Sequence, residues 1–468
     1  MKSRVLLIYP HSAMKVFEKT KVAVAVPHMP SLSLAVLAPL LLESGHEVEI
    51  LDLGMSANPI KDLVRALKLF SPDYVGVTFS TPLFYQMKEI VNKVKSYDKK
   101  IVTIGGGPHV SALPKQTLQD SRLDIGVVGE GEFSLLDVVS GKPLKSINGL
   151  CFKKDKKIFL NPVREPIKNL DDSPFPAWNL FEIKKYKTPG LTSRKNPVGP
   201  IETSRGCPFG CMYCSKSVFG RTFRAKSVKR IVDEIEYMLD CGFKEIHVMD
   251  DGFSNDMKRA KDICDEIVRR GLKFPWNLIN GIRVDRVDRE LFTKMKKAGC
   301  YRVSFGIESG EQKILNEINK GTNLNQIKTV FRLAEKAGIE TLAFFMIALP
   351  GDTEESIKKT IRFAKELEPD IIKVSITMPF PGTPLFYNWN KMGLIKTKDW
   401  SRYYYHTPDA VYNHPNLGWK TIYKYYNLFY REVYLNPEFI TRKFLKDLKN
   451  GRIFFDIFYF LKTLRYGW

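Results

Sequence analysis

Short continuous runs of Val, Ile and Leu alternate with amphipathic segments in the first part of the chain. Such runs, separated by helical segments, are typical of parallel strands that are buried on both faces. They lie at residues 4–9, 47–52, 74–79, 101–104 and 124–128, with helices expected near 33–43, 60–68 and 83–97. The pattern predicts a doubly wound parallel sheet, whose ligands bind beyond the carboxyl ends of the strands.

The same alternation returns between residues 200 and 395. Amphipathic helices, such as those expected at 229–240 and 325–336, separate the apolar runs. Strands are expected at 200–203, 245–249, 277–280, 301–306, 340–347 and 371–377. Six parallel units predict a partial (β/α)6 barrel that is open on one side, with its chemistry on the loops that follow the strands.

Between these two patterns lies a segment with short strand candidates and the proline-rich Asp171-Asp-Ser-Pro-Phe-Pro-Ala-Trp178. Prolines at this density cannot continue a sheet or a helix, so the segment is interpreted as a linker. The prediction is an α/β protein in four parts: a sheet domain at 1–140, a linker with short strands at 141–196, the partial barrel at 197–395 and a helical region at 396–468.

Composition adds a compartment and a class of partner. The odd count of 7 cysteines and the short apolar run in Met1–Pro10 argue against a secreted protein and predict a reducing cytoplasm. No apolar run reaches the roughly 18 to 20 residues that a membrane span needs. The formal net charge of +22 predicts attraction to nucleic acid, lipid headgroups or a phosphorylated substrate, or else a solvated lysine-rich surface.

The most specific chemical signal is a CxxxCxxC loop directly after an expected strand. Cys207, Cys211 and Cys214 stand there among small residues that let the backbone wrap around a cubane iron-sulfur cluster. Electron-transfer clusters take four cysteines, whereas three leave one iron open to a ligand. The other cysteines, at 151, 241, 264 and 300, are scattered singly, which disfavours a zinc ribbon. The alternative is a set of buried apolar thiols or a redox pair.

With Tyr213 before its last cysteine, the loop resembles that of the radical S-adenosylmethionine (SAM) superfamily. The resemblance implies that SAM binds the open iron through its amino and carboxylate groups. Electron transfer from the reduced cluster then cleaves SAM to a 5′-deoxyadenosyl radical that abstracts hydrogen from unactivated carbon.

The resemblance also assigns residues that position SAM. It implies that Asp250 and Asp251 face the SAM ammonium, that Glu308 and Ser304 face its ribose or amino group, that Asn280 and Arg283 meet its carboxylate, and that the loop from Ile347 contacts adenine. Each has a structural alternative. Asp251 could cap a helix, Glu308 could pair with Arg302 or Arg283, and Arg283 could be a surface charge.

Two glycine clusters follow the fourth and fifth expected strands. They resemble the loops of a cobalamin-binding domain, which implies cobalamin contacts from Gly105, Gly106, Gly107, Gly129, Glu130 and Gly131. The DxHxxG pattern that supplies an axial histidine to cobalt is missing its aspartate and glycine. His28 is the candidate left for that role, and a degenerate domain that binds nothing is the alternative.

The sheet domain and Met378-Pro-Phe-Pro-Gly-Thr-Pro-Leu385 resemble the branch that contains anaerobic Mg-protoporphyrin ester cyclase and cobalamin-dependent methylases. This resemblance implies C-methylation, or radical cyclisation or rearrangement, of a small or lipidic metabolite, with a flavodoxin or ferredoxin as electron donor. An RNA-modifying enzyme of the methylthiotransferase type would need three further cysteines near the start, yet none precedes Cys151. Nucleic acid is therefore not an expected partner. A non-enzymatic cluster or cobalamin sensor is the third alternative.

The chain after residue 410 is aromatic and basic. Between Trp419 and Trp468 it has ten Lys and Arg against four Asp and Glu. The composition is typical of helices that lie in a membrane interface, and it predicts peripheral contact with the inner membrane face. A helical cap on the open side of the barrel is the alternative.

Overall fold

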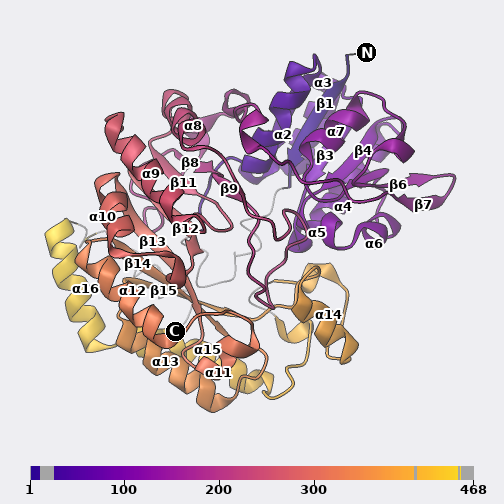
Figure 1. Ribbon diagram of the computed structural model, residues 1–468. Helices are drawn as coiled ribbons and strands as arrows, with labels where there is room; N and C mark the ends of the chain where they lie inside the picture. Colours follow the sequence, from indigo (N-terminus) through magenta and orange to yellow (C-terminus); the bar gives the residue numbers. More distant parts are fainter. Residues whose placement is uncertain (1, 11–25, 405–407, 452–453, 455–468) are drawn as a thin grey trace.

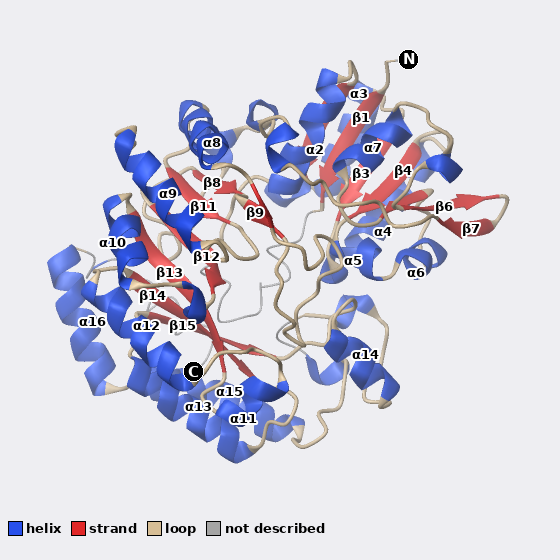
Figure 2. Ribbon diagram, in the orientation of Figure 1, coloured by secondary structure: helices blue, strands red, loops and turns tan. Residues whose placement is uncertain are grey.

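The computed structural model describes residues 2–10, 26–404, 408–451 and 454. Two α/β units lie side by side, and a helical C-terminal region runs along the outside of the second unit (Figure 1). Figure 2 shows that each unit is built around its own sheet. The predicted α/β class, with an N-terminal sheet domain, a partial barrel and C-terminal helices, is confirmed.

The N-terminal sheet has seven strands in the order β2-β1-β3-β4-β5-β6-β7. They are β1 (Arg4–Tyr9), β2 (Glu47–Asp52), β3 (Tyr74–Thr78), β4 (Val102–Gly106), β5 (Ile125–Val127), β6 (Leu150–Lys154) and β7 (Lys157–Leu160). The first five strands are parallel, as predicted, whereas β6 and β7 pair antiparallel. The sheet is therefore mixed, because the short strands expected in the linker add to its edge.

Helices cover both faces of this sheet. They are α2 (Leu32–Glu43), α3 (Pro59–Phe70), α4 (Phe84–Tyr97), α5 (Pro108–Ala112), α6 (Pro114–Gln119) and α7 (Glu132–Val139). The central strand β1 shows why its sequence is apolar throughout: Val5 and Leu7 join one buried cluster, and Leu6 and Ile8 join another. A strand buried on both faces has no polar side to alternate with.

The second sheet has six parallel strands in the order β15-β14-β13-β12-β11-β8. They are β8 (Val198–Ile201), β11 (Glu245–Val248), β12 (Trp276–Ile282), β13 (Cys300–Glu308), β14 (Glu340–Ile347) and β15 (Ile371–Ile376). Their helices are α8 (Val228–Asp240), α9 (Met257–Arg269), α10 (Arg289–Lys297), α11 (Gln312–Glu317), α12 (Leu324–Lys336) and α13 (Glu354–Leu367). This is the predicted partial barrel.

The C-terminal helix α15 (Trp419–Tyr434) covers the free edge of β15. The hydroxyl of Tyr430 accepts from the amide of Val374 at 3.0 Å, and that of Tyr434 accepts from Ile372 at 3.0 Å. Because an uncovered edge strand invites pairing with other chains, these tyrosines protect the sheet. In the described part of the chain, no helix combines the length and apolarity required to traverse a bilayer.

The segment after β15 returns to the N-terminal domain. Its helix α14 (Pro384–Lys391) and the turn at Trp400–Arg402 share a buried cluster with β3 and α4. The ring of Trp400 lies 5.3 Å from that of His109, which lies 4.9 Å from Phe84. This packing is a second junction between the two domains, in addition to the linker that connects them in sequence.

Replacing Phe305 by Ala tests the core of the second unit. Phe305 is fully buried, with its ring 5.3 Å from Phe331 and 6.3 Å from Phe292. We expect the free energy of unfolding to fall by about 3–5 kcal/mol, because the substitution leaves a cavity. Urea unfolding followed by circular dichroism measures the change. Tyr387→Ala, at a residue that is 51% exposed, is the control, and equal losses in both variants would contradict the assignment.

Candidate active site

The three-cysteine loop begins and ends at a short antiparallel ladder between β9 (Ser204–Arg205) and β10 (Arg224–Ala225). The ladder places the loop at the carboxyl end of β8. Gly206 opens the loop with φ +79°, and a Cβ there would lie 2.2 Å from the carbonyl oxygen of Thr222. Only glycine fits a position with so little space and a left-handed backbone.

The donor set of the loop suits a cubane cluster. All seven cysteines of the chain are free thiols, so Cys207, Cys211 and Cys214 are all available as ligands. Burial raises the pKa of Cys214 and Lys216 opposes that rise. Burial also works to lower the pKa of Lys216, but Cys214 and Cys207 outweigh it and raise that pKa. Lys216 is thus a cation within electrostatic reach of two of the three cysteines.

Among the described residues, no three His, Cys, Asp or Glu side chains are grouped so that they could hold one metal ion. The three cysteine ligands of a cubane bind three different irons, so they need not converge on one point. Three cysteines in one loop supply one thiolate for each of three irons, which is the donor set that a cubane with one open iron needs. The assignment of the three cysteines as ligands stays a prediction.

Contacts with both neighbouring segments hold the cysteine loop in place. The amide of Met212 donates to the carbonyl of Ile318 at 3.0 Å, and the carbonyl of Met212 accepts from the amide of Leu385 at 3.0 Å. Gly382 has φ +83°, and a Cβ on it would lie 2.9 Å from Ala112 of α5 and 3.0 Å from Ser215 Oγ of the loop. The loop, the N-terminal domain and the segment after β15 therefore meet at Gly382.

Tyr213 and Glu308, two predicted SAM-positioning residues, lie together with a lysine that the sequence analysis missed. The Tyr213 hydroxyl donates to Glu308 Oε1 at 2.8 Å, and Lys320 Nζ donates to the same oxygen at 2.7 Å. Burial and the nearby carboxylate of Glu308 raise the pKa of Tyr213 well above its usual value. Glu308 adopts φ +67° at the end of β13, a strained conformation often found at functional sites. Lys320 carries no sequence signal beyond a loop with a glycine.

The two predicted aspartates differ in their surroundings. Asp250 is buried and accepts from the amide of Thr203 at 2.6 Å and from the hydroxyl of Ser204 at 2.6 Å, so it orders the chain before the cysteine loop. Asp251 is exposed and accepts from the amide of Gly206 at 3.2 Å. Both contact residues at the start of the loop, and their contact with the SAM ammonium stays a prediction.

The side chain of Arg283 contacts three neighbouring residues of the protein. Its guanidinium lies 3.5 Å from the ring centroid of Phe209 and donates to Asp285 at 2.9 Å and to the carbonyl of Lys320 at 2.7 Å. Arg283 therefore supports the cysteine loop by packing against Phe209. Asn280 is exposed and donates to the carbonyl of Met249 at 2.7 Å. The contact of Asn280 and Arg283 with the SAM carboxylate stays a prediction.

Ser304 and Ile347 lie on neighbouring strands. Ser304 is buried on β13. Ile347 ends β14, and its carbonyl accepts from the amide of Thr377 at 2.9 Å. The loop that follows is fastened at two points: Asp352 accepts from the amide of Leu349 at 2.9 Å, and His414 Nε2 lies 3.0 Å from the Leu349 carbonyl. The expected adenine loop is therefore held partly by the C-terminal region.

The glycines of the N-terminal domain fall into two kinds. Gly107 has φ +99°, and a Cβ on it would lie 2.8 Å from the carbonyl of Phe79, whereas a Cβ on Gly106 meets no described atom within 4 Å. The backbone at Gly106 is therefore open to a ligand, and a Cβ on Gly105 would clash with Leu123 at 2.6 Å. Gly129 has φ +80°, and Gly131 packs near Leu37.

Glu130 takes part in a buried ion-pair network rather than pointing into open space. It pairs with Arg224 and lies 3.6 Å from Arg205, while Arg205 also pairs with Glu132 at 2.7 Å and with Glu202 at 2.6 Å. All five side chains are largely buried. Two of the carboxylates belong to the N-terminal domain, and both arginines belong to the ladder that closes the cysteine loop. We call this set the interdomain network.

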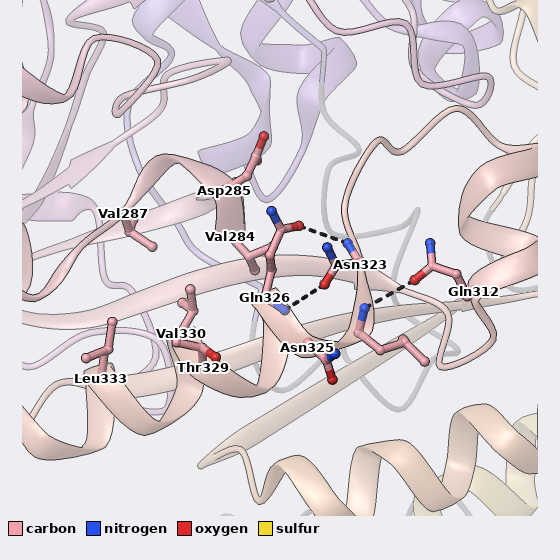
Figure 3. Close-up of a pocket in the computed structure, with 11 residues that line it drawn as sticks. Val284, Asp285, Val287, Gln312, Asn323, Asn325, Gln326, Thr329, Val330 and Leu333 are labelled. Atoms are coloured by element: carbon pink, nitrogen blue, oxygen red, sulfur yellow. Dashed lines mark hydrogen bonds between the residues drawn. The ribbon is translucent and has the colours of Figure 1, made fainter.

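His28 is joined through its backbone to the segment that precedes the second sheet. Burial lowers the pKa of His28, although Asp52 opposes the shift, and its carbonyl accepts from Thr188 at 2.9 Å. Cobalt ligation by His28 stays a prediction. A pocket of about 760 Å³ lies between α11, α12 and the turn at Val284–Arg286 (Figure 3). Its Asn323 and Gln326 form the capping box of α12, so their polar groups serve the helix.

Comparison with known proteins identifies the family. Residues 201–364 match the Radical SAM superfamily, and residues 18–139 match the B12 binding domain. The chain is 35% identical over 421 residues to an uncharacterized methyltransferase of Pyrococcus horikoshii, which covers 88% of this chain and 89% of that protein. The chain belongs to the radical SAM superfamily. It is an enzyme of the branch with a B12 binding domain, and its cofactors are a 4Fe-4S cluster, SAM and cobalamin, as predicted.

Other similar proteins agree. The anaerobic magnesium-protoporphyrin IX monomethyl ester cyclase of Rubrivivax gelatinosus is 29% identical over 412 residues, which cover 86% of this chain and 72% of that one. The structure of the radical SAM methyltransferase TsrM from Kitasatospora setae, with cobalamin and a [4Fe-4S] cluster bound, matches with a TM-score of 0.70 and 21% identity over 85% of this chain and 76% of that one. At this identity the structural match supports the fold.

The pH dependence of stability tests the loop at Asp352. Burial raises the pKa of Asp352 to about 7, although the hydroxyl of Ser356 lowers it. An unfolded aspartate loses its proton at about pH 4. The contribution of Asp352 to the free energy of unfolding is therefore fully present below about pH 4 and is lost as the pH rises to about 7. We expect Asp352→Asn to flatten this dependence in urea unfolding measured from pH 4 to pH 8. The exposed Asp240→Asn is the control, and an unchanged slope in Asp352→Asn would contradict the assignment.

Replacing Arg205 by Met tests the interdomain network. The substitution leaves buried carboxylates without a partner, and we expect the free energy of unfolding to fall by about 3–5 kcal/mol. Lys185→Met removes the exposed pair of Lys185 and Glu182 and is expected to change stability by less than about 1 kcal/mol. Urea unfolding measures both variants. A similar small effect in both would show that the network does not stabilise the fold.

Proposed function

We propose that the enzyme transfers a methyl group from cobalamin to a carbon atom of a small or lipidic metabolite. The observation that carries the proposal is the interdomain network. Arg205 and Arg224 close the cysteine loop, and the same side chains pair with Glu130 and Glu132 in the loop after β5 of the B12 binding domain. A shared set of ion pairs sets the two cofactor loops in one fixed relation, which transfer between two cofactors and a substrate needs.

The side chains around the loop have separate tasks in this proposal. Cys207, Cys211 and Cys214 would hold the cluster, and the open backbone at Gly106 would allow close approach of cobalamin. When bound, the cluster and SAM supply radical chemistry, and cobalamin supplies a methyl carrier. Glu308, paired with Lys320 at 2.7 Å, offers a fixed carboxylate to the hydroxyl or ammonium groups of SAM.

The names of similar proteins support methyl transfer. The cytidylyl-2-hydroxyethylphosphonate methyltransferase of Streptomyces wedmorensis is 29% identical over 82% of this chain, and the hopanoid C-3 methylase of Methylococcus capsulatus is 26% identical over 79%. The cyclase similarity supports a second candidate, radical cyclisation. The two reactions differ in whether the methyl group of SAM is transferred to the corrin.

The proposed partners are an electron donor, such as a flavodoxin or ferredoxin, and a membrane surface. The helix α16 (Pro437–Asn450) supports membrane contact, because Ile440, Phe444 and Leu448 lie one turn apart and are 51%, 49% and 52% exposed. The aromatic stretch that follows lies largely outside the described residues. A lipid substrate would suit such a helix.

Anaerobic reconstitution tests the proposal. The wild type is expected to bind about four irons per chain, to release 5′-deoxyadenosine when reduced with SAM, and to retain cobalamin. Ala at Cys207, Cys211 or Cys214 removes a ligand, so iron and 5′-deoxyadenosine release are expected to be lost. Cys241→Ala removes a half-buried thiol outside the loop and is the control. Iron retained in all three loop variants would contradict the ligand assignment.

Label from the methyl group of SAM distinguishes the two candidate reactions. Methyl transfer predicts that the label is recovered with the corrin after incubation of the reduced holoenzyme. Release of 5′-deoxyadenosine with no label in the corrin would favour cyclisation.

A further inference from the structure

The alternation of burial along its strands identifies the inner face of the six-stranded sheet. Along β14 and β15, residues alternate between fully buried positions, which pack against helices, and half-buried positions. Phe345 is of the first kind, with its ring 5.2 Å from Phe429 of α15. Phe344 and Lys373 are of the second kind and are paired in register, with Gly306 next to Phe344 on β13. Lys373 therefore lies on the inner face of the barrel.

Lys373 is a cation without a counterion among the described residues. It makes no hydrogen bond or ion pair with any of them, and its Nζ lies 5.7 Å from the centroid of the Phe344 ring. Burial lowers the pKa of Lys373, and no neighbouring carboxylate opposes this shift. The residue is nevertheless half-buried rather than sealed, so part of its surface stays exposed.

Other buried lysines of the same unit are paired. Lys320 contacts Glu308 at 2.7 Å, and Lys226 contacts Glu234 at 2.7 Å. Removing an ammonium group from water without a partner is unfavourable, and folded proteins normally pair it. A lysine left unpaired on the inner face of a barrel, where reactions of this fold take place, is therefore suited to an anion that arrives with a ligand.

SAM does not supply that anion. Its one negative group is its carboxylate, which is expected at the open iron of the loop after β8. Lys373 is on β15, and β8 and β15 are the two opposite edge strands of the sheet (Figure 2). The part of SAM expected near β14 and β15 is the adenine, which is neutral. An anionic group of the substrate is therefore the candidate counterion.

We propose that Lys373 binds an anionic group of the substrate, a carboxylate or a phosphate, inside the barrel. The assignment rests on the proposed function and narrows its substrate class to anionic metabolites. The Lys373 ammonium donates to the anion, the Phe344 ring lines the same site, and Ser375, the next inward residue of β15, presents a half-buried hydroxyl. Binding of the anion supplies the counterion that the described part of the protein lacks.

Titration of inorganic phosphate into the reconstituted holoenzyme, followed by calorimetry, tests the assignment. We expect Lys373→Met to weaken the tightest phosphate site at least about tenfold, the loss of one charge-assisted hydrogen bond. Lys373→Arg keeps the charge and is expected to stay within about threefold of the wild type. Lys358→Met, at an exposed lysine on the outer helix α13, is the matched control and is expected to bind phosphate like the wild type.

SAM affinity and 5′-deoxyadenosine release are measured in the same variants. We expect both to be unchanged in Lys373→Met, since the lysine serves the substrate. Phosphate binding that is equal in Lys373→Met and the wild type would overturn the assignment, as would a loss confined to SAM. Should Lys373→Met fail to load iron, Lys373→Gln takes its place under the same criteria. A wild type without iron or SAM cleavage would instead overturn the proposed function.

Discussion

Buried charge at the base of the cysteine loop is the interaction on which the arrangement of this enzyme depends. Arg205 and Arg224 face each other across a two-residue ladder and reach carboxylates from both domains. Removing either partner would leave an ion in a low-dielectric interior, where its desolvation is not offset. The network therefore resists separation of the domains more strongly than exposed ion pairs would. It also places the cluster loop and the loop after β5 against each other.

Steric constraints at glycines reinforce this arrangement. Gly206 and Gly382 both adopt a positive φ where a Cβ would clash with neighbouring segments of the same polypeptide. One allows the cysteine loop to leave its strand, and the other lets the segment after β15 cross between the loop and α5. Beyond that crossing, Trp400 and α14 pack on the N-terminal domain. The two cofactor domains are thus joined by charge on one side and by aromatic packing on the other.

The inner face of the barrel differs in character from this interface. The interface contains arginines and glutamates that satisfy one another, whereas Lys373 on the inner face has no counterion among the described residues. The difference has a physical basis. A structural ion pair stabilises the resting protein, whereas an unpaired charge is useful where a ligand completes it. Arg283 belongs to the first kind, because its stacking on Phe209 supports the cysteine loop.

The sequence by itself determined the strands, the helices and the three-cysteine loop, because each depends on residues close together in the chain. Apolar runs, amphipathic periods and cysteine spacing are all local patterns. Tertiary structure decided which polar groups meet: Glu130, expected to contact cobalamin, pairs with Arg224, 94 positions away, and Lys320 joins Tyr213 from 107 positions away. Such pairings follow from how whole sheets pack, and no local pattern encodes them. For the same reason the lack of a counterion for Lys373 among the described residues became visible only when its neighbours in space were known.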